Sequence, residues 1–471
     1  MRTLVLLPAL ALALTACADE PLPTEPDPAP EVAQPAFDIT ASSAGYTAVD
    51  LGTLGGNHSS AYAINNVGQV AGDAQTASGP WNAFFWDGTM HDLGTLGGTF
   101  SRTRAMNDVG QVVGYAGTVS GDRHAFLWDG TMHDLGTLGG DFSRADDINN
   151  AGQAVGTSTT ASGETHAFLW DGTMHDLGTL GGNYSSASAI NDAGQVVGYA
   201  RTASGQGHAF LWDGTMHDLG TLGGTGSSAV AINEAGHVVG SSGTASGGGN
   251  AFLWDGTMHD LGNLGGSESG AEDLNESGQV VGFADTPSGW YRAFLWDGTM
   301  HDLGSLSDYM SYAEAINEAG QVTGYSETDV ALHAFVWDGT MHDLGTLGGD
   351  HSWAEAINDA GVVAGEAETV TGEVHATIWR PLLTPVQRLE HCASSVADLE
   401  AQGVLNKGQT NSLVTKIDGA IAMIEVEKTR PALNKLGAFQ NEARAFVNGR
   451  KLTPEQGEEL ISCVQGVIDA L

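Results

Sequence analysis

Residues 134–175 read DLGTLGGDFSRADDINNAGQAVGTSTTASGETHAFLWDGTMH, and close copies of this stretch fill most of the chain. The tripeptide Asp-Leu-Gly returns every 42 residues, and once after 41, from Asp50 to Asp343. A tryptophan keeps the same step from Trp86 to Trp379. The chain therefore contains eight copies of one unit, which indicates a fold built by repeating a single supersecondary motif.

Each unit contains four short strand patterns, which in one copy cover residues 187–191, 195–198, 208–212 and 216–219. The links Asn191-Asp192-Ala193-Gly194 and Asp213-Gly214-Thr215 are typical of tight hairpins, in which glycine takes a positive φ. Four antiparallel strands in about 42 residues make one β-propeller blade, whereas the coils of a β-solenoid, the alternative, are usually shorter.

The two ends of the array favour a closed ring. Residues 46–51 form a fourth-type strand with no third strand before it, and the last unit stops after Trp379 without a fourth strand. The N-terminal strand can complete the last blade and leave no open sheet edge. We therefore expect an eight-bladed β-propeller of four-stranded blades over residues 46–379.

The units resemble the bacterial extracellular HAF repeats, named for the His-Ala-Phe found here at His124, His166 and His208. The resemblance covers the whole array, where HAFLWDGTMHDLGTLGG recurs almost unchanged. It implies an extracellular protein and transfers no activity. Asn250 and Arg292 replace the histidine in two units, and the seventh unit has SLSDYMS in place of the TLGG loop.

The N-terminus resembles that of a bacterial lipoprotein. Residues 1–17 combine Arg2, a short apolar run and Leu14-Thr15-Ala16-Cys17, which resembles a lipobox and implies lipidation of Cys17. Residues 18–45 are Pro-rich and acidic, as expected of an extended tether. We expect a protein of the bacterial cell envelope that is anchored to the membrane by lipid and faces the periplasm or the cell exterior.

The charge distribution excludes one class of partner and suggests another. A net charge of −40 argues against nucleic-acid binding. The array has no lysine and only six arginines, and we expect these in variable loops on one face, together with several aromatic residues. Rings and guanidinium groups suit a glycan or protein ligand, although exposed loops also vary without any ligand. The candidate binding residues are Arg102, Arg104, Arg123, Arg144, Trp81, Trp290, Tyr291 and Arg292.

The repeated histidines lie beside aspartates at His91, His133, His175, His217, His259, His301 and His342. One such residue per blade forms a wide ring rather than a compact metal site, so we expect hydrogen bonds around the Asp-Gly turn. The sequence contains no nucleophile elbow, phosphate loop or HExxH motif, and it predicts no cofactor, metal or catalytic residue. The primary hypothesis is a binding or adhesion module, and the alternatives are a glycan-active propeller enzyme and a structural surface protein.

The composition changes after Pro385, and residues 386–471 predict a small all-α domain. Helical periodicity covers residues 386–401, 407–427 and 431–447, and Thr453-Pro454 opens a fourth helix. In an exported protein, Cys392 and Cys463 would form a disulfide between the first and last helices. The segment resembles the helical FIMAH-type domain of secreted bacterial proteins, which implies an appended docking module without catalysis.

Overall fold

The computed structural model describes residues 39–40, 45–382 and 384–471. This part of the chain is mostly β, followed by four helices. The predicted signal peptide, the lipidation site Cys17 and most of the predicted tether lie outside the described residues.

The repeats form four-stranded antiparallel sheets in which the strands pair in chain order. Repeat 1 contains β3 (Gly55–Ile64), β4 (Val70–Thr76), β5 (Trp81–Trp86) and β6 (Met90–Asp92). The strands of repeats 2–4 are β7 (Gly97–Met106), β8 (Val112–Thr118), β9 (Arg123–Trp128), β10 (Met132–Gly136), β11 (Gly139–Ile148), β12 (Ala154–Thr160), β13 (Thr165–Trp170), β14 (Met174–Asp176), β15 (Gly181–Ile190), β16 (Val196–Thr202), β17 (Gly207–Trp212) and β18 (Met216–Gly220).

Repeats 5–7 continue the same order with β19 (Gly223–Ile232), β20 (Val238–Thr244), β21 (Gly249–Trp254), β22 (Met258–Asp260), β23 (Ser269–Leu274), β24 (Val280–Asp285), β25 (Tyr291–Trp296), β26 (Met300–Asp302), β27 (Ser311–Ile316), β28 (Val322–Glu327), β29 (Leu332–Trp337) and β30 (Met341–Asp343). Repeat 8 contains β31 (Gly348–Ile357), β32 (Val363–Thr369) and β33 (Val374–Pro381). Its fourth strand is β2 (Tyr46–Asp50), which pairs antiparallel with β33 and also with the two-residue β1 (Ile39–Thr40).

The first strand of the unit is longer than predicted. The sequence pattern predicts residues 187–191, but β15 covers Gly181–Ile190. Its register with β16 shifts twice, between Gly181 and Ser185 and between Ala187 and Ala189. Such bulges break the alternation of buried and exposed side chains, so the pattern identified only the end of the strand.

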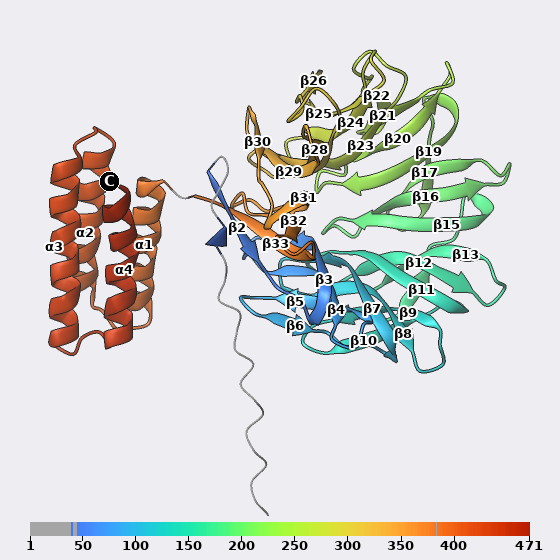
Figure 1. Cartoon of the computed structure of the whole chain (residues 1–471). Helices are drawn as coiled ribbons and strands as arrows, with labels where there is room; N and C mark the ends of the chain where they lie inside the picture. The colour runs from blue at the N-terminus through green and yellow to red at the C-terminus, as the bar shows by residue number, and fades with distance from the viewer. Residues whose placement is uncertain (1–38, 41–44, 383) are drawn as a thin grey trace, which may run out of the picture. The chain divides into compact units, whose positions relative to one another are not determined.

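Neighbouring repeats are joined by a chain of asparagine hydrogen bonds. The Nδ2 atom of Asn107 donates to the carbonyl oxygen of Asn149, 2.9 Å away, in the next repeat. The same bond recurs along the array, and Asn358 of repeat 8 donates to the carbonyl of Asn65 in repeat 1 at 3.0 Å. Figure 1 shows the sheets around a common centre in chain order, with the last repeat beside the first.

The core of the array lies between neighbouring sheets. Phe126 is fully buried in a cluster with Phe85 and Leu93 of the preceding repeat, and Trp128 packs against the same cluster. The repeated tryptophan therefore packs between neighbouring sheets. Glycine is required where strands approach closely, because a Cβ atom at Gly114 would lie 1.9 Å from the carbonyl oxygen of Arg102. In the first hairpin turn Gly194 has the predicted positive φ of 79°.

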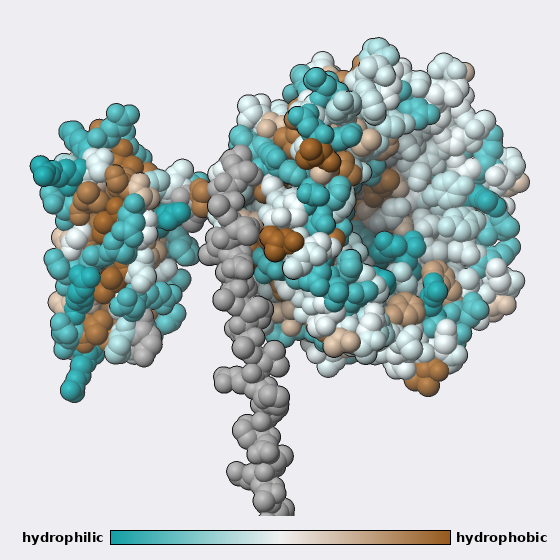
Figure 2. Space-filling view, viewed as in Figure 1, coloured by the Kyte–Doolittle hydropathy of each residue, from teal (hydrophilic) through white to brown (hydrophobic). Residues whose placement is uncertain are grey.

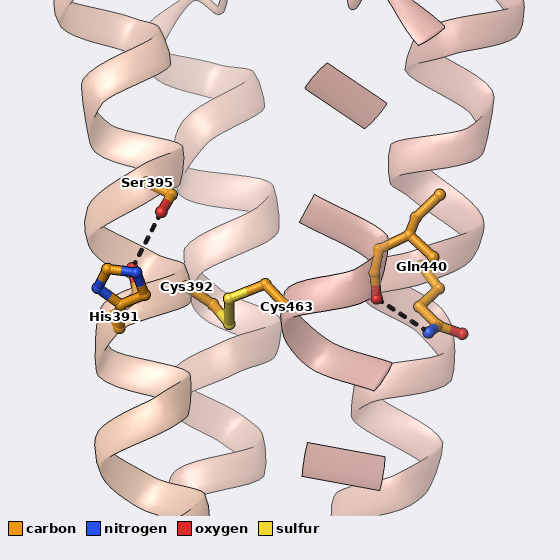
Figure 3. Close-up of a disulfide and its surroundings, with 6 residues drawn as sticks. His391, Cys392, Ser395, Gln440 and Cys463 are labelled. Carbon is orange, nitrogen blue, oxygen red and sulfur yellow. Dashed lines mark hydrogen bonds between the residues drawn. A yellow bond between two sulfur atoms is a disulfide. The ribbon is translucent and has the colours of Figure 1, made fainter. Parts of the chain in front are cut away.

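The C-terminal segment contains four helices, α1 (Pro385–Ala401), α2 (Lys407–Ile424), α3 (Thr429–Asn448) and α4 (Pro454–Ala470). Thr453 caps α4 in a capping box with Gln456. The apolar faces of the helices form one cluster, and a disulfide joins Cys392 of α1 to Cys463 of α4, as predicted (Figure 3). Within the described ranges, no helix is both long and apolar enough to cross a membrane.

Candidate functional site

The first strands of successive repeats contact one another around the array, and β31 contacts β3 in the same way. They therefore form its inner wall, and Figure 2 shows the surface hollowed towards the middle of the face in view. Each repeat has one wall position three residues before the asparagine that bonds to the next repeat. This position holds an acid in four repeats and four different residues in the others. These inner-wall residues are Tyr62, Arg104, Asp146, Ser188, Val230, Glu272, Glu314 and Glu355.

Repeats 1–3 place four of the predicted arginines in one group, which we call the arginine cluster (Trp81, Arg102, Arg104, Arg123 and Arg144). The guanidinium of Arg102 lies 4.5 Å from the ring centroid of Trp81, and its Nη1 atom lies 3.1 Å from a carboxylate oxygen of Asp73. Burial raises the pKa of Asp73 to about 6, although Thr103 N–H and Arg102 both stabilise its charged form.

The other arginines of this cluster also have partners inside the chain. Arg144 lies 2.7 Å from Oδ1 of Asp146, and Arg104 of the preceding repeat lies 3.8 Å from the same atom. The guanidinium of Arg123 lies 5.6 Å from the ring of Phe100. Most of this positive charge is therefore balanced by the protein itself.

The expectation that the arginines lie in loops is wrong. Arg102 and Arg104 lie in β7, Arg144 in β11, Arg123 at the start of β9 and Arg292 in β25. For Arg102 and Arg144 the error has the same cause as the short predicted strand: the first strand begins at the Gly-Gly pair, so residues that looked like a connecting loop belong to the inner wall.

Repeats 6 and 7 contain a second group, the aromatic cluster (Phe283, Tyr291, Tyr312 and Tyr325). The ring centroids of Phe283 and Tyr291 are 5.4 Å apart, and those of Tyr312 and Tyr325 are 5.3 Å apart. The ring centroid of Tyr312 also lies 5.3 Å from that of Phe283 and 5.7 Å from that of Tyr291. The four rings therefore form one continuous surface. Only Tyr291 was predicted from the sequence.

The other predicted residues of repeat 6 lie beside this cluster in the chain. Trp290 is 40% exposed and its ring centroid lies 5.5 Å from that of Tyr309, which is 43% exposed. Arg292 is held by the side chain of Ser305 and by the carbonyl oxygen of Asp308, 2.7 Å from its Nη2 atom. The predicted site residues thus form two groups on opposite sides of the array, not one (Figure 1).

Carboxylates gather on the inner wall of repeats 6–8. Burial raises the pKa of Glu314 to about 7, and the charge of Glu272 adds to this rise. Burial also raises the pKa of Glu355 to about 7, with further contributions from Glu314 and Glu366. Across the described ranges, Glu272, Glu314 and Glu355 form no ion pair. Sequence reasoning missed them because acids are abundant throughout the array.

The repeated histidines bond to the Asp-Gly turns, as predicted. The Nε2 atom of His133 lies 2.8 Å from Oδ1 of Asp129 and 3.0 Å from Oγ1 of Thr131. The His-Ala-Phe histidines form a further set of pairs that was not predicted, such as His124 with Asp134 at 2.9 Å. In the described part of the chain, no three His, Cys, Asp or Glu side chains are arranged to hold a metal ion.

No protein-family model matches the chain, and no curated protein matches it either. Among solved structures, the β-propeller domain of the Trilobed protease from Pyrococcus furiosus is 12% identical over 61% of this chain and 97% of that chain, with a TM-score of 0.43. The SapL1 lectin in complex with alpha methyl fucoside is 12% identical over 62% of this chain and 99% of that chain, with a TM-score of 0.30.

A six-bladed β-propeller lectin from Aleuria aurantia is 13% identical over 61% of this chain and 93% of that chain, with a TM-score of 0.27. At TM-scores this low, none of these likenesses carries an inference about ligand or family. The described chain is a mostly β repeat protein of four-stranded sheets that has β-propellers among its structural neighbours and ends in four helices.

Proposed function

We propose that the array is an eight-bladed β-propeller closed by β2, and that it acts as an extracytoplasmic binding or adhesion module. The closure is supported by the pairing of β2 with β33 and by the hydrogen bond from Asn358 to Asn65. Each inter-repeat contact then has a counterpart at the junction of repeats 8 and 1.

One observation carries the binding proposal: a constant scaffold presents side chains of different size and charge at the same inner position of its repeats. The buried asparagine is identical in all eight repeats, whereas the position five residues before it holds Ser60, Arg102, Arg144, Ser186, Ser228, Gly270, Tyr312 and Trp353. Residues that only pack between sheets are the same in every repeat, whereas residues that contact a ligand can differ. We therefore place the ligand on the inner wall and on the loops that continue it. These loops are the second-to-third-strand and repeat-to-repeat connections.

The location of the protein is part of the same proposal. The lipobox-like residues 14–17, the Pro-rich segment after them and the resemblance to extracellular HAF repeats support a lipid-anchored protein of the bacterial cell envelope. The helical domain would then be a FIMAH-type appended module. Mass spectrometry of the mature N-terminus tests the anchor: we expect diacylglyceryl-modified Cys17 as the first residue, and an intact Met1 would contradict it.

A glycan-active enzyme is the second candidate, favoured by a specific observation. A general acid works best with a pKa near the operating pH, and Glu314 and Glu355 are neighbouring inner-wall carboxyls whose pKa is raised to about 7. Incubation of any bound glycan with the protein, followed by mass spectrometry, separates the two candidates. Unchanged ligand supports a binding module, and shortened or unsaturated products support an enzyme.

Glycan and peptide arrays probed with the chain from residue 18 test the proposed function. We expect specific binding to at least one class of ligand, and we expect substitutions on the inner wall to weaken it. Binding to no ligand on either array would favour a structural surface protein.

A further inference from the structure

Several aromatic rings of the array lie beside one of the protein's own cations. In repeats 1, 2 and 4 the protein places its own guanidinium groups near half-buried rings. The pairs are Arg102 with Trp81 at 4.5 Å, Arg104 with Tyr115 at 6.0 Å, Arg123 with Phe100 at 5.6 Å and Arg201 with Tyr184 at 5.9 Å. In the part of the chain that the structure describes, none of the four rings of the aromatic cluster has such a cation.

Corresponding positions of repeats 2 and 7 show how the difference arises. Repeat 2 carries Arg102 and Arg104 on its first strand and Tyr115 on its second. Repeat 7 keeps the ring, as Tyr325, but has Tyr312 in place of Arg102 and Glu314 in place of Arg104. Repeat 2 therefore supplies the cation for its own ring, whereas repeat 7 supplies a second ring and a carboxylate.

Carboxylates from repeats 6 and 7 border the aromatic cluster. The hydroxyl of Tyr291 donates to Oε2 of Glu268 at 3.2 Å. Glu314 lies two residues after Tyr312 in β27, and Tyr312 pairs directly with Tyr325 of β28. The charge of Glu314 raises the pKa of both tyrosines. The nearest arginine in the sequence, Arg292, is already bonded to Ser305 and Asp308. Rings with unbalanced carboxylates form the kind of surface that attracts an organic cation.

We propose that the aromatic cluster, together with Glu268 and Glu314, binds the cationic side chain of a basic peptide segment. The bound group takes the place that the protein's own arginines occupy in repeats 1 and 2, where guanidinium groups lie over Trp81 and Tyr115, at the positions that hold Tyr291 and Tyr325 in repeats 6 and 7. Trp290 and Tyr309 are exposed near this site in the chain and offer apolar contact to the rest of the segment. The inference rests on the proposed binding function and names its ligand class.

Calorimetric titration with two short peptides tests the proposal. One is acetyl-Gly-Arg-Gly-Arg-Gly amide, and the other has citrulline in place of each arginine, which keeps the shape and removes the charge. We expect the arginine peptide to bind at least about ten-fold more tightly than the citrulline peptide. Equal binding of the two would overturn the proposal.

Four variants separate the site from general attraction to an acidic protein. Glu314→Gln and Tyr312→Leu should each weaken binding of the arginine peptide about five-fold or more, while Tyr312→Phe, which keeps the ring, should retain it. Glu164→Gln removes one exposed charge from a loop of repeat 3 and should change binding less than two-fold. An equal loss in Glu314→Gln and Glu164→Gln would mean non-specific attraction and would overturn the proposal.

The variants can be checked for folding by their thermal transitions. Glu314→Gln removes one of several neighbouring acids, so it should fold at least as well as the parent. The proposal can therefore be tested with Glu314→Gln even if Tyr312→Leu does not fold. If the arrays yield a ligand but the arginine peptide does not bind, this inference fails and the proposed function stands. If neither binds, both fail.

Discussion

At the scale of single residues, one serine in each repeat joins neighbouring sheets. The Oγ atom of Ser143 is fully buried, accepts from the N–H of Ala125 at 2.7 Å and donates to the carbonyl oxygen of Gly136 at 2.5 Å. The corresponding serines make the same two bonds in every repeat. They satisfy backbone groups that the strand ladder leaves without a partner.

Replacing one such serine should destabilise the array locally. Ser143→Ala leaves a buried N–H and a buried carbonyl unpaired, so we expect the free energy of unfolding to fall by about 1–3 kcal/mol in urea titrations. Ser162→Ala, on an exposed loop of the same repeat, should change it by less than about 0.5 kcal/mol. Equal effects of the two variants would contradict a structural role for the buried serine.

The acidic inner wall predicts a pH dependence of stability. The pKa of Glu314 and of Glu355 is about 7 in the folded protein, above the ordinary value of 4.5, because the surrounding protein desolvates both carboxyls and other carboxylates lie nearby. The folded state therefore binds more protons than the unfolded state between about pH 4.5 and 7. Stability from these groups is greatest below this window and falls as the pH rises through it.

Glu314→Gln removes one of these groups and provides the test. We expect a higher thermal midpoint than that of the parent at pH 8. The corresponding gain in the free energy of unfolding is about 1 kcal/mol once screening by water at the wall is allowed for. At pH 4.5 the two proteins should unfold at nearly the same temperature, since the parent side chain is then protonated. A midpoint difference that does not change with pH would rule out this origin.

At the scale of elements, the disulfide ties the two ends of the helical domain together. Cys392 and Cys463 are 71 residues apart and join α1 to α4, so the bond restricts the unfolded chain over almost the whole domain (Figure 3). Cys463→Ser should lower the stability of the helices by about 2–4 kcal/mol. Circular dichroism at 222 nm measures the change, and a reducing agent should shift the parent but leave the variant unaltered.

How well the elements could be predicted depended on local pattern. The hairpin turns, the third and fourth strands and the four helices follow from turn residues, alternation and caps, all of which are local. The first strand could be located only in part, because its bulges at Gly181 and Ala187 break the alternation. For this reason Arg102 and Arg144 looked like loop residues although they belong to the inner wall.

The aromatic cluster could not be predicted, for a different physical reason. Tyr312 and Tyr291 lie in different repeats, and only the ring-like arrangement of the sheets brings them to 5.7 Å. An alignment of the repeats does show that position 312 corresponds to position 102, so the exchange of arginine for tyrosine was readable. The consequence of this exchange could not be predicted, because it depends on which side chain lies over each ring in the folded protein.

At the scale of the whole molecule, the proposed closure of the ring depends on β2. Within β2, Tyr46 and Ala48 are buried, and Ala48 pairs with Trp379 of β33. Deleting residues 46–50 would expose this edge and part of the core of repeat 8, so we expect a loss of about 3 kcal/mol or more and a tendency to aggregate. Deleting residues 20–24 is the length-matched control and should have little effect on the thermal midpoint.

Hydrogen–deuterium exchange with an array-selected ligand locates the surface that binds it. If the variable inner wall and its loops bind the ligand, amides of the connecting loops and first strands, such as residues 286–291 and 303–316, should exchange more slowly in its presence. The constant turns on the opposite side, such as residues 275–279, and the helical domain should be unaffected. Protection confined to those turns or to the helices would contradict the account.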